Sequence, residues 1–204
     1  DGAGAGAPGA EGVGGDDPPD RGPLRQGRVE RQPLPVRRQG LLPTYAQYFN
    51  FVSAAQVYGG TFQFFNLRMR ERAAHVRWVT EPWDIEAWRK LIDGDTRFLY
   101  GEMPSNPQQA CFDIRAIAEL AHSHGIPFIV DSTIATPALM RPLQHGADIV
   151  VQSLTKTIGA GGFTIGGAVI TRHGLISRHL TDEAKADYAT WLKLWPFRDS
   201  GPCM

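Results

Sequence analysis

The sequence predicts an α/β protein with a largely parallel β-sheet that helices cover on both faces. Short apolar runs at residues 96–101, 127–131 and 147–152 alternate with helical patterns at residues 113–124 and 139–145. Such runs are typical of strands that are buried on both faces, and the intervening helices supply the crossovers that parallel strands require. Together the alternation and the apolar runs indicate this fold class.

The first elements each have a local signal. Residues 49–57 predict a strand or a buried segment, and residues 61–71 have helical spacing of apolar residues with basic residues toward the end. Residues 76–79 are a short strand candidate. Residues 84–93 predict a helix with an acidic first turn, which Gly94 ends.

The central elements are marked by their caps. Asp113 is a good N-cap for a helix over residues 114–124, and Gly125 suits the position after its C-terminus. We expect the short helix over residues 139–145 to end at Gly146. Residues 166–171, GGAVIT, predict a further strand.

Two unlike parts make up the chain. Residues 1–43 are rich in Gly, Pro, Asp and Arg and have almost no apolar periodicity. A segment of this composition cannot bury enough surface to offset its chain entropy, so we expect it to be disordered or foreign to the fold. Residues 44–204 are expected to form one partial large domain.

The composition argues against several classes of partner. The formal net charge is zero and the sequence pI is about 7.2, which gives no reason to expect nucleic acid or a membrane surface as partner. No apolar run approaches the roughly 20 residues that span a bilayer. Only Cys111 and Cys203 are present, so we expect no disulfide framework, no cysteine-rich metal site, and a cytoplasmic location.

Polar side chains follow three of the predicted strands at the point where each strand ends. Because the carboxyl ends of parallel strands meet at one edge of a sheet, we expect these side chains to converge on a ligand. The residues concerned are Glu102, Ser105 and Asn106, then Asp131, Ser132 and Thr133, then Ser153, Thr155 and Lys156.

This set of groups suits one cofactor. A lysine at a partly desolvated strand end loses its proton more easily and can form a Schiff base with an aldehyde. Hydroxyls near the glycine-rich turn after Lys156 suit a phosphate, and a neighbouring carboxylate can pair with a ring nitrogen. Pyridoxal 5'-phosphate (PLP) needs all three groups. Taken singly, Asp131 fits a turn cap, Ser153 and Thr155 fit loop hydroxyls, and Lys156 fits a solvated surface lysine.

The motifs in their order resemble a known family. The block PSNPQQACFDIRAIAELAHSHGIPFIVDSTIATPALMRPLQHGADIVVQSLTKTIG, residues 104–159, is similar to the Cys/Met-metabolism family of PLP enzymes. The resemblance covers about residues 50–195. It implies the large domain of a fold-type I PLP-dependent transferase, present here in part.

The resemblance also implies main roles for six residues and supporting roles for two more. Lys156 would carry the cofactor, Asp131 would pair with the pyridine nitrogen, and Asn106 would bind the ring 3'-oxygen. Ser153 and Thr155 would bind the phosphate. Tyr58, in the motif VYGGT, would stack on the ring and assist proton transfer. Glu102 and Thr133 lie in matching positions with supporting roles.

Within the family, the segment FTIGGAVI and the tail after it favour the O-acetylhomoserine sulfhydrylase branch. That implies γ-replacement, in which acetate leaves an O-acyl homoserine and sulfide adds to give homocysteine, in a homotetramer or other homo-oligomer. The alternatives are γ-elimination, as in the lyases, and an inactive truncated remnant. Family members carry a phosphate-binding segment before VYGGT and a smaller C-terminal domain, and we expect this chain to lack both.

Overall fold

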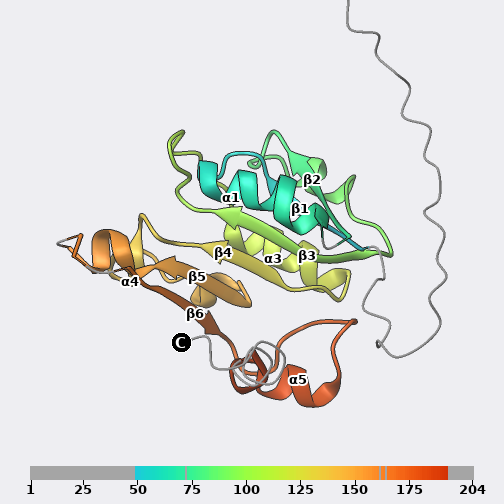
Figure 1. Ribbon diagram of the computed structural model, residues 1–204. Helices are drawn as coiled ribbons and strands as arrows, with labels where there is room; N and C mark the ends of the chain where they lie inside the picture. The colour runs from blue at the N-terminus through green and yellow to red at the C-terminus, as the bar shows by residue number, and fades with distance from the viewer. Residues whose placement is uncertain (1–48, 72, 161, 164, 193–204) are drawn as a thin grey trace, which may run out of the picture. The chain divides into compact units, whose positions relative to one another are not determined.

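The central feature of the computed structural model is a six-stranded sheet with the strand order β2-β1-β3-β4-β5-β6 (Figure 1). All neighbouring strands are parallel except β5 and β6, which are antiparallel. The strands are β1 (Phe49–Ala54), β2 (Ala74–Val79), β3 (Thr96–Glu102), β4 (Phe128–Asp131), β5 (Ile149–Ser153) and β6 (Gly167–Thr171). This architecture confirms the predicted fold class.

The structure describes residues 49–71, 73–160, 162–163 and 165–192. The prediction made for residues 1–43 lies outside this range. The helices are α1 (Gly59–Gln63), η1 (Phe64–Met69), α2 (Ile85–Arg89), α3 (Ile114–Ser123), α4 (Thr136–Leu139), η2 (Pro142–His145), η3 (Leu154–Ile158) and α5 (Asp182–Ala186). Within the described ranges, none of them has the length and apolar character needed to cross a bilayer.

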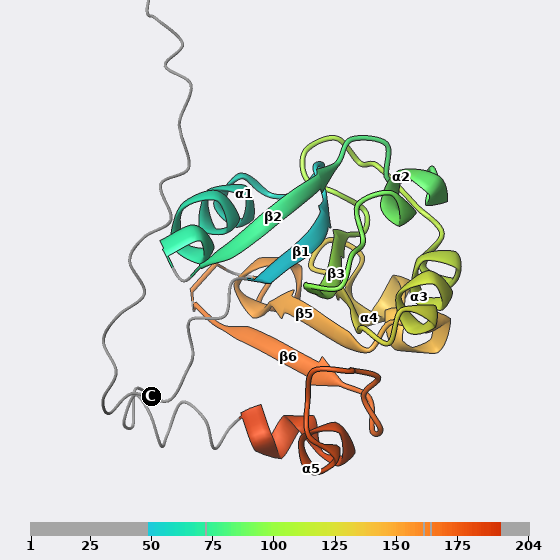
Figure 2. The same cartoon turned by 90° about the vertical axis from the view of Figure 1, so that its right-hand side faces the viewer.

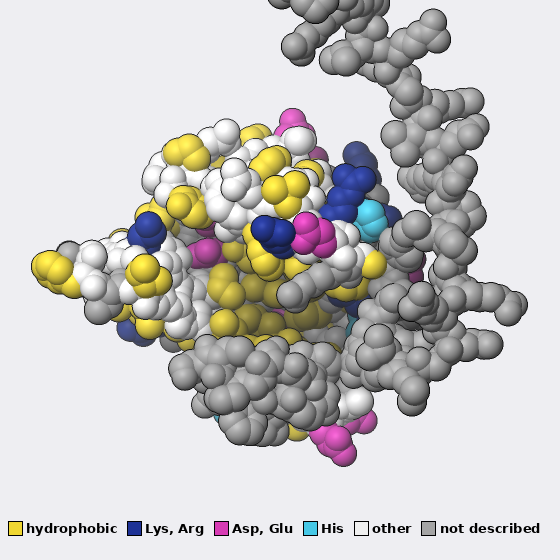
Figure 3. Space-filling model, in the orientation of Figure 1, with side chains coloured by type: hydrophobic (Ala, Val, Ile, Leu, Met, Phe, Trp, Pro, Cys, Tyr) yellow, Lys and Arg dark blue, Asp and Glu magenta, His cyan; other side chains and the backbone are white. Residues whose placement is uncertain are grey.

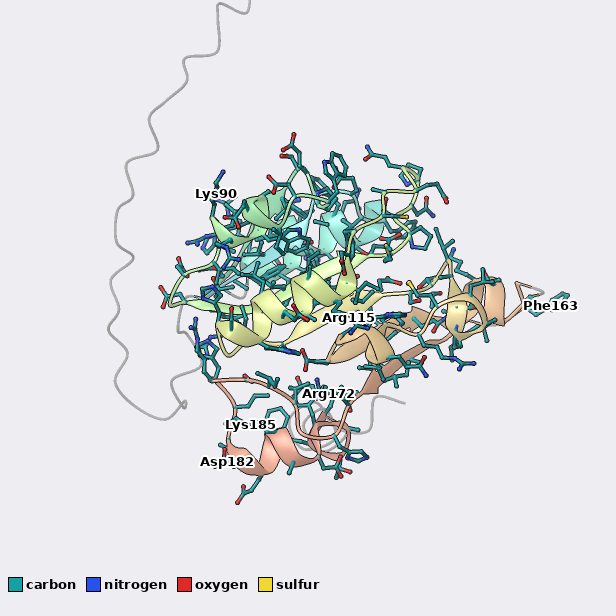
Figure 4. The ribbon with its side chains drawn as sticks, turned by 180° about the vertical axis from the view of Figure 1, so that it is seen from behind. Lys90, Arg115, Phe163, Arg172, Asp182 and Lys185 are labelled. Atoms are coloured by element: carbon teal, nitrogen blue, oxygen red, sulfur yellow. The ribbon has the colours of Figure 1, made fainter. Side chains whose placement is uncertain are left out.

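Two apolar clusters lie on opposite faces of the sheet. Trp88 of α2 and Ile117 of α3 pack with Leu99 and Phe128 on one face. Phe65 of η1 packs with other aromatic residues on the other face. Neighbouring strand residues such as Leu99 and Tyr100 belong to different clusters, because successive side chains of a strand point to opposite faces. The views in Figure 2 and Figure 4 show α2 and α3 together on one side.

Helix α3 follows its sequence signals closely. The Asp113 carboxylate accepts hydrogen bonds from the backbone N–H of Arg115 (2.9 Å) and of Ala116 (3.1 Å), so it caps the helix. Gly125 has φ +65° and ends the helix in the left-handed region that glycine adopts freely. The predicted N-cap and C-terminal glycine are therefore both confirmed.

The helix predicted over residues 139–145 is wrong as one element. Helix α4 ends at Leu139, Met140 is extended (φ −145°, ψ 139°), and a separate 3-10 turn runs from Pro142 to His145. Proline has no N–H to donate and disfavours helical backbone at the residue before it, so the chain restarts at Pro142. The predicted stop at Gly146, with φ +101°, is correct.

A buried carboxylate ties the amino-terminal edge of the sheet to α3. Asp148 is fully buried, and its Oδ2 lies 2.7 Å from His122 Nε2 and accepts from the Phe128 N–H at 2.9 Å. Arg172 lies 3.6 Å from its other oxygen. The sequence suggests that His122 is a helix cap or a solvated residue. Instead its side chain is mostly buried against Asp148, since a buried charge needs partners.

A second carboxylate, that of Asp93, makes the free energy of unfolding depend on pH in the acidic range. Burial on its own raises the pKa of Asp93, but hydrogen bonds from Asn50, Arg77, the Asp95 N–H and Thr96 outweigh it and hold the pKa at about 2, below the ordinary 3.8. A lowered folded-state pKa stabilises the fold above pH 3.8, and this contribution is lost as the pH falls toward 2.

We therefore expect Asp93→Asn to reduce the free energy of unfolding by ~1 kcal/mol at pH 6, a value discounted because the side chain is 40% exposed. The difference from wild type should shrink between pH 4 and pH 2. Urea unfolding across this range measures it, with Glu81→Gln, an exposed carboxylate, as control. A destabilisation that stays constant down to pH 2 would contradict the prediction.

Candidate active site

The ends of β3, β4 and β5 bring three polar residues to one edge of the sheet. Glu102 and Asp131 are direct neighbours in the parallel register of β3 and β4. The backbone N–H of Ser153, the last residue of β5, donates to Thr133 Oγ1 at 2.9 Å. The structure therefore shows the convergence at the strand ends that the sequence predicts.

Asp131 is held from one side. Its Oδ1 accepts from the Thr133 N–H at 2.9 Å and from the Thr133 hydroxyl at 2.6 Å. Among the residues that the structure describes, its Oδ2 has one long hydrogen bond, 3.4 Å from the Tyr100 hydroxyl. Since Thr133 occupies one oxygen and also accepts from Ser153, Asp131 is fixed in place while its second oxygen keeps the capacity to accept from a ligand.

Glu102 joins two loops of the site. It is 4% exposed, its Oε2 accepts from the Tyr58 N–H at 2.6 Å, and its Oε1 accepts from the Asn106 N–H at 2.8 Å. Burial and then the charge of Asp131 raise the pKa of Glu102, while the two N–H donors oppose the shift. One carboxylate thus fixes the backbone of two predicted site residues that are 48 positions apart in the printed sequence.

Tyr58 and Lys156 lie next to each other. Tyr58 is the residue before α1, and it is 49% exposed. The Lys156 Nζ atom lies 6.0 Å from the centre of this ring. Lys156 lies within η3 but has φ −87° and ψ −124°, so the helix is kinked at the lysine. An exposed aromatic face and an amine are therefore presented together.

A cavity of about 540 Å³ opens beside these groups. Figure 3 shows a hollow with hydrophobic side chains on its floor. Its walls come from the α1–η1 segment on one side and from β3, β4, β5 and β6 on the other. The lining residues are Tyr58, Gly60, Thr61, Phe64, Phe65, Tyr100, Asp131, Val151, Gln152, Ser153, Gly167, Ala168 and Val169.

Three of the six predicted site residues, Tyr58, Asp131 and Ser153, line this cavity, and the others lie outside its lining. Lys156 does not line the cavity, but its amine lies beside the ring of Tyr58, which does. The Thr155 hydroxyl is engaged with Gly166, accepting from its N–H at 2.9 Å and donating to its carbonyl at 3.2 Å. Asn106 is exposed, and it is its backbone N–H that reaches Glu102.

Tyr100 is a polar aromatic residue of the cavity that was not predicted from the sequence. Tyr100 lies next to Asp131, but it is the third apolar-looking residue of the strand signal TRFLYG. Alternation along β3 is the signal that could have found it, because Tyr100 and Glu102 share a face.

The comparisons with known proteins fit this geometry. A family model described as Cys/Met metabolism PLP-dependent enzyme matches residues 44–187. The chain belongs to this family. The resemblance stated from the motifs is therefore confirmed, and so is PLP as the cofactor, because the family is defined by its dependence on PLP.

Curated relatives of the chain include two enzymes of sulfur amino-acid metabolism. The chain is 41% identical over 121 residues to O-acetyl-L-homoserine sulfhydrylase of Corynebacterium glutamicum, and 40% identical over 124 residues to homocysteine synthase of Schizosaccharomyces pombe. Each match covers 59% of this chain and 28% of the relative. The chain thus spans less than a third of the length of these relatives.

Two solved structures are similar in fold. A provisionally assigned O-acetylhomoserine (thiol)-lyase of Campylobacter jejuni, which contains N'-pyridoxyl-lysine-5'-monophosphate, superposes with a TM-score of 0.59 at 35% identity. Cystathionine γ-lyase of Lactobacillus plantarum, in complex with L-serine, has the same TM-score at 34% identity. The matches cover 61% of this chain and 30% and 32% of the two structures.

The residues present fit PLP in their chemistry. A volume of about 540 Å³ is in the range of small-ligand sites, roughly 300–1,000 Å³. Asp131 Oδ2 is a carboxylate oxygen with spare accepting capacity, and the Tyr58 ring offers a half-exposed aromatic face. Lys156 supplies an amine beside that face. These are the groups that would hold the ring and its aldehyde.

The turn that carries Lys156 depends on Gly159. A Cβ atom at Gly159 would lie 2.5 Å from the backbone oxygen of Leu154, so the turn must shift to accept a side chain. We expect Gly159→Ala to weaken PLP binding by on the order of 10-fold, because it displaces the lysine. Fluorescence titration with PLP measures this.

The matched control for this prediction is Gly94→Ala, because a Cβ atom at Gly94 meets nothing within 4 Å. Gly94→Ala should bind PLP as wild type does. If Gly159→Ala binds PLP equally well, the turn does not position the lysine.

Proposed function

We propose that the chain is the PLP-binding part of an enzyme that carries out O-acetylhomoserine sulfhydrylation, a γ-replacement that gives homocysteine. The observation that carries the proposal is the placement of Tyr58, Asp131 and Ser153 around one cavity, with the Lys156 amine 6.0 Å from the Tyr58 ring. The sulfhydrylase and homocysteine synthase names of the relatives support the choice of reaction.

When bound, PLP supplies an electron-accepting ring that stabilises negative charge beside the substrate Cα. Lys156 would bind the aldehyde carbon and, once released by the incoming amino acid, hold and move the Cα proton. Asp131 Oδ2 would accept from the protonated ring nitrogen. The phenol of Tyr58 would assist proton transfer toward the leaving acetate.

The remaining predicted residues would orient the cofactor. Ser153, whose hydroxyl has no hydrogen bond among the described residues, would donate to the phosphate together with Thr155. Asn106 would bind the ring 3'-oxygen. We further propose a homo-oligomer in the cytoplasm, with an O-acyl homoserine and sulfide as substrates.

A second reaction is favoured by one observation. The cystathionine γ-lyase of Lactobacillus plantarum matches this chain as well in fold, with a TM-score of 0.59, as the provisionally assigned (thiol)-lyase does. The two structures therefore do not separate γ-replacement from γ-elimination. The chain can be assayed for both reactions, since their products differ.

The test is to load the 204-residue chain with PLP and supply O-acetyl-L-homoserine with sulfide in one assay and L-cystathionine in another. Homocysteine formed in the first assay, without 2-oxobutyrate in the second, is the expected result. 2-Oxobutyrate from cystathionine alone would establish γ-elimination instead. PLP binding with neither product would show that this chain has no activity of its own.

A further inference from the structure

Tyr100 lies on β3 with its side chain on the face of the sheet that carries the candidate active site. It is 7% exposed and packs in a cluster with Phe51 and Phe65. The Phe65 ring meets it edge-on, with ring centres 4.9 Å apart and an angle of 87° between the planes. A phenylalanine would make the same ring contacts, so packing alone does not call for the hydroxyl.

The hydroxyl of Tyr100 reaches the polar part of the cavity. It lies 3.4 Å from Asp131 Oδ2, and the residue lines the same cavity as Tyr58 and Ser153. Burial, then the charges of Asp131 and Glu102, raise the pKa of Tyr100 well above its ordinary 10.0. The phenol therefore keeps its proton at working pH and acts as a donor toward the carboxylate.

Without the Tyr100 contact, the two oxygens of the Asp131 carboxylate would differ in their number of hydrogen-bond donors. Two donors from Thr133, at 2.9 Å and 2.6 Å, hold Oδ1. Among the described residues, the Tyr100 hydroxyl is the one side-chain donor that reaches Oδ2. A third donor on the second oxygen fixes the plane of the carboxylate, and its length leaves Oδ2 able to accept a stronger hydrogen bond.

We propose that Tyr100 is a positioning residue that acts through Asp131. Its neutral hydroxyl holds the carboxylate plane so that Oδ2 faces the protonated ring nitrogen of PLP. No proton leaves the phenol in this role. The inference rests on the proposed PLP site, and it adds a residue to which the motifs assign no role.

The first test needs no cofactor. Unfolding by urea is compared for wild type, Tyr100→Phe, Asp131→Ala and the double variant. We expect Tyr100→Phe to raise the equilibrium constant for unfolding by roughly 3- to 10-fold in the wild-type background. In the Asp131→Ala background the effect should fall below about 2-fold. Asp131→Leu, whose side chain has a similar size and no hydrogen-bonding atom, replaces Asp131→Ala if the latter does not fold.

The second test separates positioning from packing. Dissociation constants are measured for PLP and for its analogue in which a C–H group replaces the ring nitrogen. We expect Tyr100→Phe to weaken PLP binding by roughly 3- to 10-fold and to leave binding of the carbon analogue unchanged. Tyr188→Phe is the matched control, because it removes a phenol that burial alone perturbs. It should change neither constant.

The outcomes are distinguishable. Equal loss of affinity for both ligands, or unchanged PLP affinity in Tyr100→Phe, overturns the proposal. An effect of Tyr100→Phe on unfolding that is the same with and without Asp131 overturns it as well. If wild type binds no PLP, the proposed function fails, and the unfolding comparison alone decides whether Tyr100 supports Asp131.

Discussion

Lys156→Ala is expected to abolish the covalent link between this chain and PLP. Lys156 is the lysine placed beside the Tyr58 ring at the cavity, and its amine would bind the aldehyde and move the substrate proton. Borohydride treatment of the PLP-loaded wild type should leave one pyridoxyl group on the peptide that contains Lys156. The variant should carry none. Where the chain shows activity, it should fall by at least about 10²- to 10⁴-fold, the usual contribution of a positioned base.

Lys90→Ala is the control for this experiment. Lys90, which is labelled in Figure 4, is exposed just after α2 and does not line the cavity. Its variant should be labelled at Lys156 as wild type is. A pyridoxyl group found on another lysine of the wild type would refute the assignment of Lys156.

Glu102→Ala is expected to have the largest effect on the structure of the site. The change removes the buried carboxylate that accepts from the N–H groups of Tyr58 and Asn106. Two hydrogen bonds to one charged group are lost, so we expect the free energy of unfolding to fall by about 2–4 kcal/mol. Hydrogen exchange should become faster at both amides, and PLP should bind more weakly because the segment with Tyr58 is released.

Glu102→Gln separates the effect of the negative charge from the effect of the side-chain shape, because the glutamine oxygen still accepts one of the two hydrogen bonds. The pKa of Glu102 is raised in the fold, so wild type loses stability relative to the neutral glutamine as pH rises through that value. The cost of Glu102→Gln should thus be larger at pH 4 than at pH 8. Glu86→Ala, an exposed carboxylate paired with Arg89, should cost little in either measurement.

Long-range contacts are what the sequence did not predict. His122 and Asp148, Tyr58 and Glu102, and Tyr100 and Asp131 lie 26, 44 and 31 positions apart. Another example is Arg178, which donates to the carbonyls of Asp93, Gly94, Thr96 and His124. No local period or cap motif encodes such pairs, because they arise only when different strands and helices pack.

The segment after η3 shows the same limit at a single residue. Phe163 belongs to an apolar-looking stretch, yet it is 93% exposed. Figure 4 shows it at the tip of the loop between η3 and β6, away from the sheet. Composition cannot tell this position from a core residue. Its exposure follows from the path of the backbone between η3 and β6.

The sequence by itself determined the largely parallel sheet and the caps of α3. It also determined that Glu102, Asp131 and Ser153 meet at the edge formed by the strand ends. It could do so because strand ends and helix caps depend on neighbouring residues, and parallel strands bring their ends together whatever the side chains. The tertiary structure alone decided which oxygen of Asp131 keeps spare accepting capacity, which loops Glu102 holds and where the cavity lies. These follow from distances between elements, which only packing sets.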